Sequence, residues 1–176
     1  MEEAIKAILG LSSMGKGGFI FPERFVSSQE VSFLFHIRLC DLLIEYLSSF
    51  EGDSELKSRA AYALVMLDVD RGFDVLQKAI FEEWRPIVDE IIRAVGYLRP
   101  LQPGHWIILD QASRCQDVEL RRAVFDVLMK LFEFYREEVL SLVDKMLARE
   151  DNKELREHIE QNLAFLKGRS TLSLLD

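Results

Sequence analysis

Cysteine and histidine are scarce in this sequence of 176 residues, which contains two of the first and three of the second. Small secreted domains held by disulfides are rich in cysteine, so the two isolated thiols, Cys40 and Cys115, indicate reduced core residues in a cytosolic protein. A long apolar run is also missing. The most apolar stretch, residues 31–47, is interrupted by charged side chains such as Arg38 and Asp41, which a membrane span would exclude.

The beginning of the chain is acidic, and its apolar run is too short and broken for a secretion signal. The expected location is therefore the cytoplasm. Basic residues are outnumbered, with 22 Lys and Arg against 30 Asp and Glu, and the formal net charge is −8. An acidic chain repels a phosphate backbone, so we expect no nucleic-acid binding. A protein partner with a basic surface is favoured instead, because its charge complements that of the acidic chain.

Motifs for metals and cofactors are also missing. His36, His105 and His158 are isolated, and no H-x-x-x-H, H-E-x-x-H or C-x-x-C spacing occurs, so no metal site is expected. No cofactor is expected either, and His36 is interpreted as a core or boundary histidine. Cys115 follows Arg114, and a neighbouring positive charge can activate a thiol. A small residue in a turn between helices is the favoured interpretation of Cys115.

The segment 10–18, GLSSMGKGG, nearly spells a nucleotide-binding loop. Such a loop joins a strand to a helix, and a Ser or Thr after its lysine ligates magnesium. Here Gly17 follows Lys16, residues 2–11 have a helical pattern, and Pro22 lies where a helix should run. The sequence therefore predicts a mobile connector that binds no nucleotide.

Three phenylalanines, Phe19, Phe21 and Phe25, follow these glycines. Two interpretations stay open: the rings pack under the first helix pair, or they form a partly exposed contact patch. Sustained alternation of apolar and polar residues is missing, so no strand is expected apart from a short extension at residues 17–21.

What the sequence does contain is a repeated apolar pattern. An apolar residue is followed by others four, seven, eight and eleven positions later, starting at Leu56, Ile87, Leu120 and Leu155; in the last copy Asn162 stands at one of these positions. The starting points are 31, 33 and 35 residues apart. This spacing places one apolar stripe on one face of each helix. We expect the stripe residues Leu64, Val95, Leu128 and Leu163 to share one continuous core.

The stripes predict four helices over residues 54–67, 85–98, 118–132 and 153–167. Shorter patterns between them predict helices over residues 71–81, 104–114 and 136–147, and a long helix is expected over residues 29–50. Asp53, Asp117 and either Asp151 or Asn152 are the expected N-caps, since a side-chain oxygen can accept from the free N–H groups of the first turn. Pro86 suits the first turn of its helix, and Gly168 is expected to end the last one.

Helix pairs of this period, with the stripe D-x-x-[L/V]-R-x-x-A-x-x-A-L-x-x-L, resemble HEAT repeats, especially the short HEAT-like repeats of the phycobilisome-lyase type. The resemblance covers residues 53–167 and departs from the pattern at Lys57 and Val88, where Arg is usual, and at Val124, where Ala is usual. The alternative is a non-repeating helical bundle. The matching residues are Asp53, Leu56, Ala60, Ala63, Leu64, Ala94, Val95, Gly96, Leu98, Asp117, Leu120, Arg121, Leu155 and Arg156.

The resemblance implies an all-α, HEAT-like helical-repeat solenoid with an atypical N-terminal helical cap. One structural domain is expected, made of the cap (1–52, with the glycine-rich and aromatic loop at 10–28), the repeats (53–167) and a tail (168–176). The tail carries three leucines. It is expected to dock on the last apolar face or to join a second subunit in a homo-oligomer.

The family mostly implies scaffolding and partner binding, so the expected function is a protein–protein interaction scaffold, adaptor or regulatory subunit. The alternative is a HEAT-like enzyme, a lyase or DNA glycosylase, that acts on a ligand in the concave groove. By the same resemblance the second helices line the concave side. Trp106 there is either a surface anchor or a core residue. The candidate binding residues on that side are Lys78, Phe81, His105, Trp106, Asp110, Ser141, Asp144 and Lys145.

Overall fold

The computed structural model describes residues 29–49 and 52–172, with side chains for 36–49 and 52–164. Within these ranges the fold is all-α, with eight helices and no strand. The predicted N-terminal helix, the glycine-rich loop, Phe19, Phe21 and Phe25 lie outside the described residues. The helices are α2 (Gln29–Ser48), α3 (Ser54–Asp68), α4 (Phe73–Phe81), α5 (Arg85–Tyr97), α6 (Pro103–Ala112), α7 (Val118–Leu131), α8 (Arg136–Arg149) and α9 (Lys153–Leu172).

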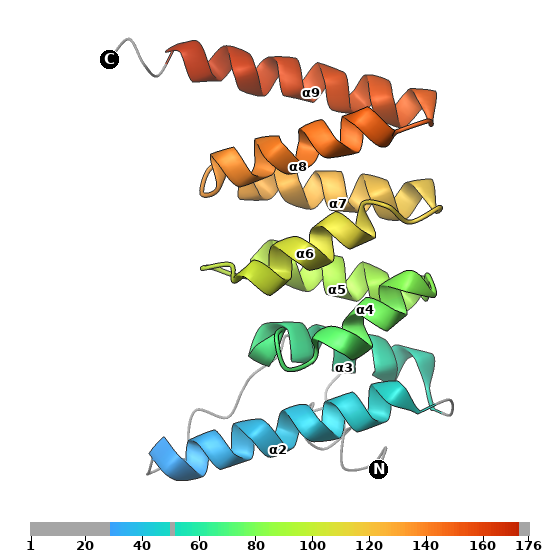
Figure 1. Cartoon of the computed structure of the whole chain (residues 1–176), viewed down its shortest axis with the longest axis vertical. Coiled ribbons are helices and arrows are strands. Elements are labelled where there is room, and N and C mark those ends of the chain that lie inside the picture. Colours follow the sequence, from blue (N-terminus) through green and yellow to red (C-terminus); the bar gives the residue numbers. More distant parts are fainter. Residues whose placement is uncertain (1–28, 50–51, 173–176) are drawn as a thin grey trace, which may run out of the picture.

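The helices form two layers, and successive helices run in opposite directions (Figure 1). The first layer contains α3, α5, α7 and α9, in which each helix packs on the next. The second layer contains α2, α4, α6 and α8, which lie in front of the first layer in Figure 1. Every turn from the second layer to the first therefore lies on one edge of the stack, and every turn back lies on the opposite edge. Among the described residues, no helix is both long and apolar enough to cross a membrane.

The apolar stripes face the interior between the layers. Leu64, Val95, Leu128 and Leu163 are all buried in one hydrophobic cluster, which confirms the prediction of a continuous core. The first-layer helices begin where the caps were expected. Asp53 Oδ1 accepts from the N–H of Leu56 at 2.8 Å, and Asp117 Oδ1 accepts from that of Glu119 at 2.8 Å.

The open choice between Asp151 and Asn152 is decided in favour of the amide, because Asn152 Oδ1 accepts from the N–H of Leu155 at 2.9 Å. The prediction that Gly168 ends the last helix is wrong, since α9 continues to Leu172. A glycine weakens a helix interior by about 1 kcal/mol relative to alanine and does not by itself stop the helix. The expected tail thus begins within α9, and its last four residues, 173–176, lie outside the described ones.

Gly72 precedes α4, which starts at Phe73 rather than at residue 71. A Cβ atom on Gly72 would lie 2.4 Å from Cδ2 of Leu64, closer than packed atoms can approach. The glycine therefore lets the turn between α3 and α4 lie directly on the core.

A chain of polar contacts fastens the edge on which the second layer turns into the first. We call it the polar edge. At its start, buried Lys57 of α3 donates to the carbonyl of Ser49, and its ammonium lies 5.7 Å from the ring centroid of Trp84 in the turn before α5. The next link joins two turns, because Glu83 Oε1 accepts from the N–H of Gln116 at 2.6 Å.

Arg121 of α7 makes the last link of the polar edge. Its Nε and Nη2 donate to the two carboxylate oxygens of Glu150 at 2.8 and 2.7 Å, and its Nη1 donates to the carbonyls of Cys115 and Gln116 at 2.8 Å each. The carbonyl of Glu150 in turn accepts from Arg156 of α9. Lys57, Arg121 and Arg156 occupy the same position in their stripes, directly after Leu56, Leu120 and Leu155. This position therefore fastens the turns in three of the four first-layer helices.

Replacing Leu128 with Ala should lower the free energy of unfolding by about 2–5 kcal/mol, because the cavity term adds to the lost burial. Leu128 is fully buried in the core. Denaturant titration measures the change. The exposed Gln161→Ala variant on α9 is the control and should stay within about 0.5 kcal/mol of the parent. A loss below about 1 kcal/mol for Leu128→Ala would contradict the shared core.

The stability of the fold should depend on the protonation of Glu150. Its ion pair with Arg121 holds the pKa of this carboxyl below its ordinary value. The unfolded chain then binds the proton more tightly than the folded one, so this stabilisation is complete above about pH 4.3 and is lost as the pH falls through the lowered folded-state pKa.

Denaturation midpoints measured from about pH 3 to pH 7 should therefore rise more steeply with pH in the parent than in Glu150→Gln. The control is Glu160→Gln, which removes a carboxyl that is half exposed and lies 3.9 Å from Arg156. Its curve should follow that of the parent. Parallel curves for the parent and Glu150→Gln would show that the buried pair does not contribute in this pH range.

Candidate functional site

The candidate residues of the second layer separate into exposed and internal ones. Lys78 and Phe81 on α4 are exposed, and so are Ser141, Asp144 and Lys145 on α8. Phe81 has 88% of its surface exposed, at the end of α4. Lys78 lies 3.9 Å from Glu82, the residue that follows α4. All five therefore lie on the surface of the second layer.

His105 does not lie on an exposed face, which corrects its place among the candidate binding residues. It is buried at the start of α6, where its Nδ1 accepts from the N–H of Gln102 at 2.9 Å. Its Nε2 lies 3.4 Å from the carbonyl of Val65, so the neutral ring donates there. Burial lowers the pKa of His105, which keeps the ring neutral. The imidazole therefore caps α6 and joins it to α3.

Asp110 and Trp106 also have partners inside the molecule. Asp110 pairs with Arg114 in the turn after α6 and lies 3.5 Å from Nη2 of Arg149 on α8. Trp106 is half-buried against the core, and its ring meets that of Tyr135 edge to face with centroids 5.5 Å apart. The Tyr135 hydroxyl accepts from the N–H of Leu101 at 2.8 Å. Trp106 thus packs the turn before α6 and is better placed as a core residue than as a surface anchor.

A hollow of about 200 Å³ lies in the first layer, between α5 and α7. We call it the α5–α7 groove. Gly96 lies in it, and a Cβ atom there would lie 3.2 Å from Val127, so the glycine keeps the two helices close without filling the space. Charged residues of both signs surround this apolar floor. The lining residues are Asp89, Ile92, Arg93, Gly96 and Tyr97 from α5, and Ala123, Asp126, Val127 and Lys130 from α7.

The charges in the α5–α7 groove are not equally available. Arg93 pairs with Glu90 and stacks on the ring of Tyr62, 5.4 Å from its centroid. Burial raises the pKa of Asp89, with a smaller opposing effect from Arg85. A carboxylate that is partly desolvated gains more from an approaching cation than one in water does.

Exposed aromatic rings lie near the end of α5. Tyr97, which lines the α5–α7 groove, has 67% of its surface exposed. Two residues further on, the Arg99 guanidinium lies 4.7 Å from the ring centroid of Phe134 in the turn after α7. Tyrosine and arginine are enriched at the centres of protein interfaces. The sequence pattern does not indicate Tyr97 as a surface residue, because its exposure depends on the end of α5 at that residue.

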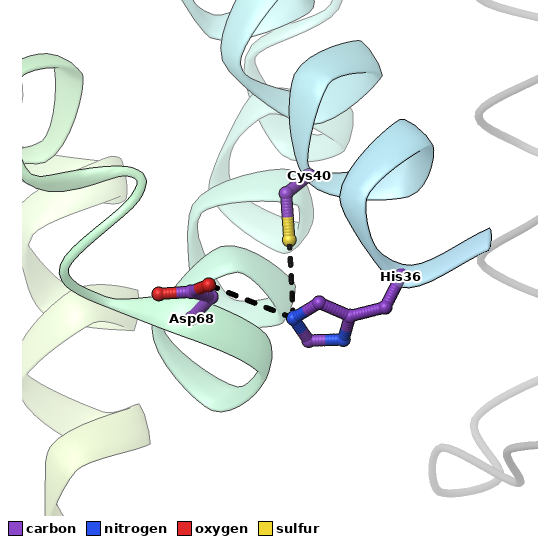
Figure 2. Close-up of side chains that lie close together, drawn as sticks. All are labelled: His36, Cys40 and Asp68. Carbon is purple, nitrogen blue, oxygen red and sulfur yellow. Dashed lines mark hydrogen bonds and ion pairs between the residues drawn. The ribbon is translucent and has the colours of Figure 1, made fainter. Parts of the chain in front are cut away.

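A second group of chemically capable side chains joins α2 to α3 (Figure 2). Nε2 of His36 lies 3.8 Å from Sγ of Cys40 and 3.6 Å from Oδ2 of Asp68, and Figure 2 shows both contacts meeting at the same ring nitrogen. The three potential ligand atoms lie within 4.8 Å of one another. Cys40 is fully buried, whereas the side chains of His36 and Asp68 are each 34% exposed.

This arrangement differs from a catalytic triad, in which the acid and the nucleophile contact opposite nitrogens of the histidine. The expectation of no metal site rested on the absence of H-x-x-x-H, H-E-x-x-H and C-x-x-C spacings, none of which combines a histidine with a cysteine. His36 and Cys40 are four residues apart, so they lie on one face of α2, and this spacing could have been found in the sequence. Asp68 could not, because it comes from the end of α3.

Cys115 has the surroundings of a structural thiol. It is buried in the turn before α7, and its Sγ lies 3.8 Å from the carbonyl of Ile80. Burial raises the pKa of Cys115 to about 11, and nearby Glu83 adds to this effect. The thiol therefore stays protonated at neutral pH, which agrees with the interpretation of a small turn residue and disfavours a nucleophile.

Replacing Trp106 with Ala should lower the free energy of unfolding by on the order of 2 kcal/mol. This is less than for a fully buried aromatic residue, because only part of the Trp106 ring is removed from water. Tyr135→Phe keeps the ring contact and removes only the hydroxyl that accepts from Leu101, so it should cost about 1 kcal/mol. Denaturant titration measures both. A Trp106→Ala variant as stable as the parent would restore the interpretation of Trp106 as a surface anchor.

Comparisons with protein-family models, with curated proteins and with solved structures find no match for this chain. The resemblance to HEAT repeats therefore rests on the stripe residues.

Proposed function

We propose that the stack is a HEAT-like solenoid that serves as a protein-binding scaffold or adaptor, and that the α5–α7 groove receives a basic segment of its partner. The observation that carries the proposal is the groove itself. Its volume of about 200 Å³ is below the roughly 300–1,000 Å³ of small-molecule sites. A space of this size suits one or two side chains of a protein partner better than a separate substrate.

Charge favours a basic segment. Of the two cations in the groove, Arg93 is compensated by Glu90. Asp89 also has a partner, Arg85 at 3.9 Å, so the local charges of Asp89, Asp126 and Lys130 are close to balanced, and the preference for a basic segment comes from the net charge of −8. An arginine or lysine of the partner could pair with the two carboxylates and lie against the exposed ring of Tyr97, where a cation–π contact contributes about 0.5–1 kcal/mol. Complementary charge of this kind mainly speeds association and sets orientation.

The expected enzyme alternative receives less support from the described residues. The concave-face candidates of that hypothesis include His105, which is buried as a helix cap, and Asp110, which is held by arginines. These two side chains therefore do not offer the convergent acid and base that such an enzyme needs.

The test uses Asp126→Lys in the α5–α7 groove and Asp144→Lys on α8 as its matched control. Both aspartates are exposed and lie within helices, and denaturant titration of both variants checks that neither reversal changes stability by more than about 0.5 kcal/mol. Affinity capture from native lysate with mass spectrometry identifies the partner, and titration calorimetry with that purified partner measures the affinity. Asp126→Lys should weaken binding about ten-fold or more, and Asp144→Lys should leave it nearly unchanged.

Tyr97→Ala should also weaken binding by about 1 kcal/mol or more while leaving the unfolding midpoint nearly unchanged. Raising the salt concentration should slow association, because exposed charges act mainly on the on-rate. The opposite pattern, loss of binding in Asp144→Lys alone, would place the interface on the second layer with Phe81 and Lys145. Full binding by all three variants would overturn the α5–α7 groove as the interface.

A further inference from the structure

The geometry points to a binding site for a divalent metal ion of the zinc class, formed by Nε2 of His36, Sγ of Cys40 and Oδ2 of Asp68. The site lies between α2 and the end of α3 (Figure 2) and shares no residue with the α5–α7 groove. An imidazole, a thiolate and a carboxylate together suit zinc and similar borderline ions, whereas magnesium and calcium prefer oxygen ligands alone.

The distances fit such an ion after small side-chain shifts. Zinc bonds of about 2.0–2.1 Å to nitrogen, 2.0–2.2 Å to oxygen and 2.3 Å to sulfur place tetrahedral ligands about 3.4 Å (N to O) and 3.6 Å (S to N) apart. The structure has 3.6 Å from Nε2 to Oδ2 and 3.8 Å from Sγ to Nε2. The remaining pair, Sγ and Oδ2, lies within 4.8 Å and can close further because Asp68 is partly exposed.

Neighbouring groups orient the carboxylate. Oδ1 of Asp68 accepts from the backbone N–H of Arg71 at 3.0 Å, which leaves Oδ2 directed at His36. A hydrogen bond to one oxygen of a ligating carboxylate is a usual support of metal sites. The turn after α3 therefore positions Asp68 for the role.

The local charge also permits a divalent cation. The nearby Arg71 guanidinium would repel it, but Asp41 neutralises this charge through bonds of 2.8 and 3.1 Å to Nη2 and Nε. The thiolate of Cys40 and the carboxylate of Asp68 then balance the two charges of the ion. Burial raises the pKa of Cys40 to about 11, with a further contribution from Asp68. The metal must therefore displace the thiol proton, which passes to the solvent.

Access is available from one side. His36 and Asp68 are each one-third exposed, whereas Cys40 is fully buried, so an ion would be held from the interior and would face solvent outward. Three protein ligands leave a fourth tetrahedral position for water or another small ligand. Zinc sites with an open position differ in this way from closed structural sites with four protein ligands.

Cobalt(II) is the direct probe, because a thiolate-to-cobalt charge-transfer band in the near ultraviolet reports a sulfur ligand. The full chain, without a histidine tag, should bind one cobalt ion, show this band and lose it when zinc is added. Cys40→Ala should abolish the band. Cys115→Ala is the matched control: it removes the other buried thiol, whose Sγ lies near the carbonyl of Ile80, and it should keep the band. A parent chain without the band in excess cobalt, or a Cys40→Ala chain that retains it, would overturn the site.

Two further variants keep the test decisive should Cys40→Ala fail to fold. His36→Gln and Asp68→Asn alter partly exposed side chains, and each should weaken zinc binding about ten-fold or more in calorimetry, since even outer-shell changes cost that much. Zinc should raise the unfolding temperature of the parent, because it binds only the folded site, whereas magnesium should not. Equal zinc affinity in the parent and both variants would show that the ion binds elsewhere. Binding at the α5–α7 groove is measured separately, so failure of one proposal leaves the other intact.

Discussion

The ion pair between Arg121 and Glu150 is the contact that aligns the second half of the stack. Taking two charges out of water is costly, and the cost is recovered only when their geometry is good and their remaining hydrogen-bonding groups are satisfied. Here the guanidinium meets both carboxylate oxygens and two carbonyls of the preceding turn. A hydrophobic contact could slide, whereas this arrangement has one register. It therefore fixes how α8 and α9 follow α6 and α7.

The other contacts of the polar edge also fix neighbouring turns relative to each other, and they do so without burying a complete ion pair. Lys57 holds the turn before α3, and Glu83 holds the N–H of Gln116 in the turn before α7. With one edge fixed by hydrogen bonds, the opposite edge carries aromatic packing, as in the contacts of Trp106 with Tyr135 and of Arg99 with Phe134. The α5–α7 groove lies between neighbouring first-layer helices that this edge holds in register. A side-chain-sized hollow can persist there because Gly96 faces Val127 across fixed backbones.

Much of this architecture could be predicted from the sequence, because it depends on local spacing. The stripes located all four first-layer helices to within a few residues, and Asp53 and Asp117 cap two of them as expected. What could not be predicted depends on contacts between helices. The burial of His105 follows from its reach to Val65 on another helix. The α5–α7 groove depends on how closely two helices approach, and a one-dimensional pattern does not contain that distance.

The cluster of His36, Cys40 and Asp68 could also be predicted only in part from the sequence. The spacing of His36 and Cys40 is local to α2, whereas Asp68 comes from α3. Lys57 already fastens α3 to the preceding turn on the polar edge, at the far end of α3 from Asp68. An ion held by the cluster would tie α2 to α3 at the opposite edge (Figure 1). The α2–α3 pair would then be fixed at both ends, and the free energy of binding would add to the stability of that pair, because an ion that binds only the folded arrangement stabilises it by mass action.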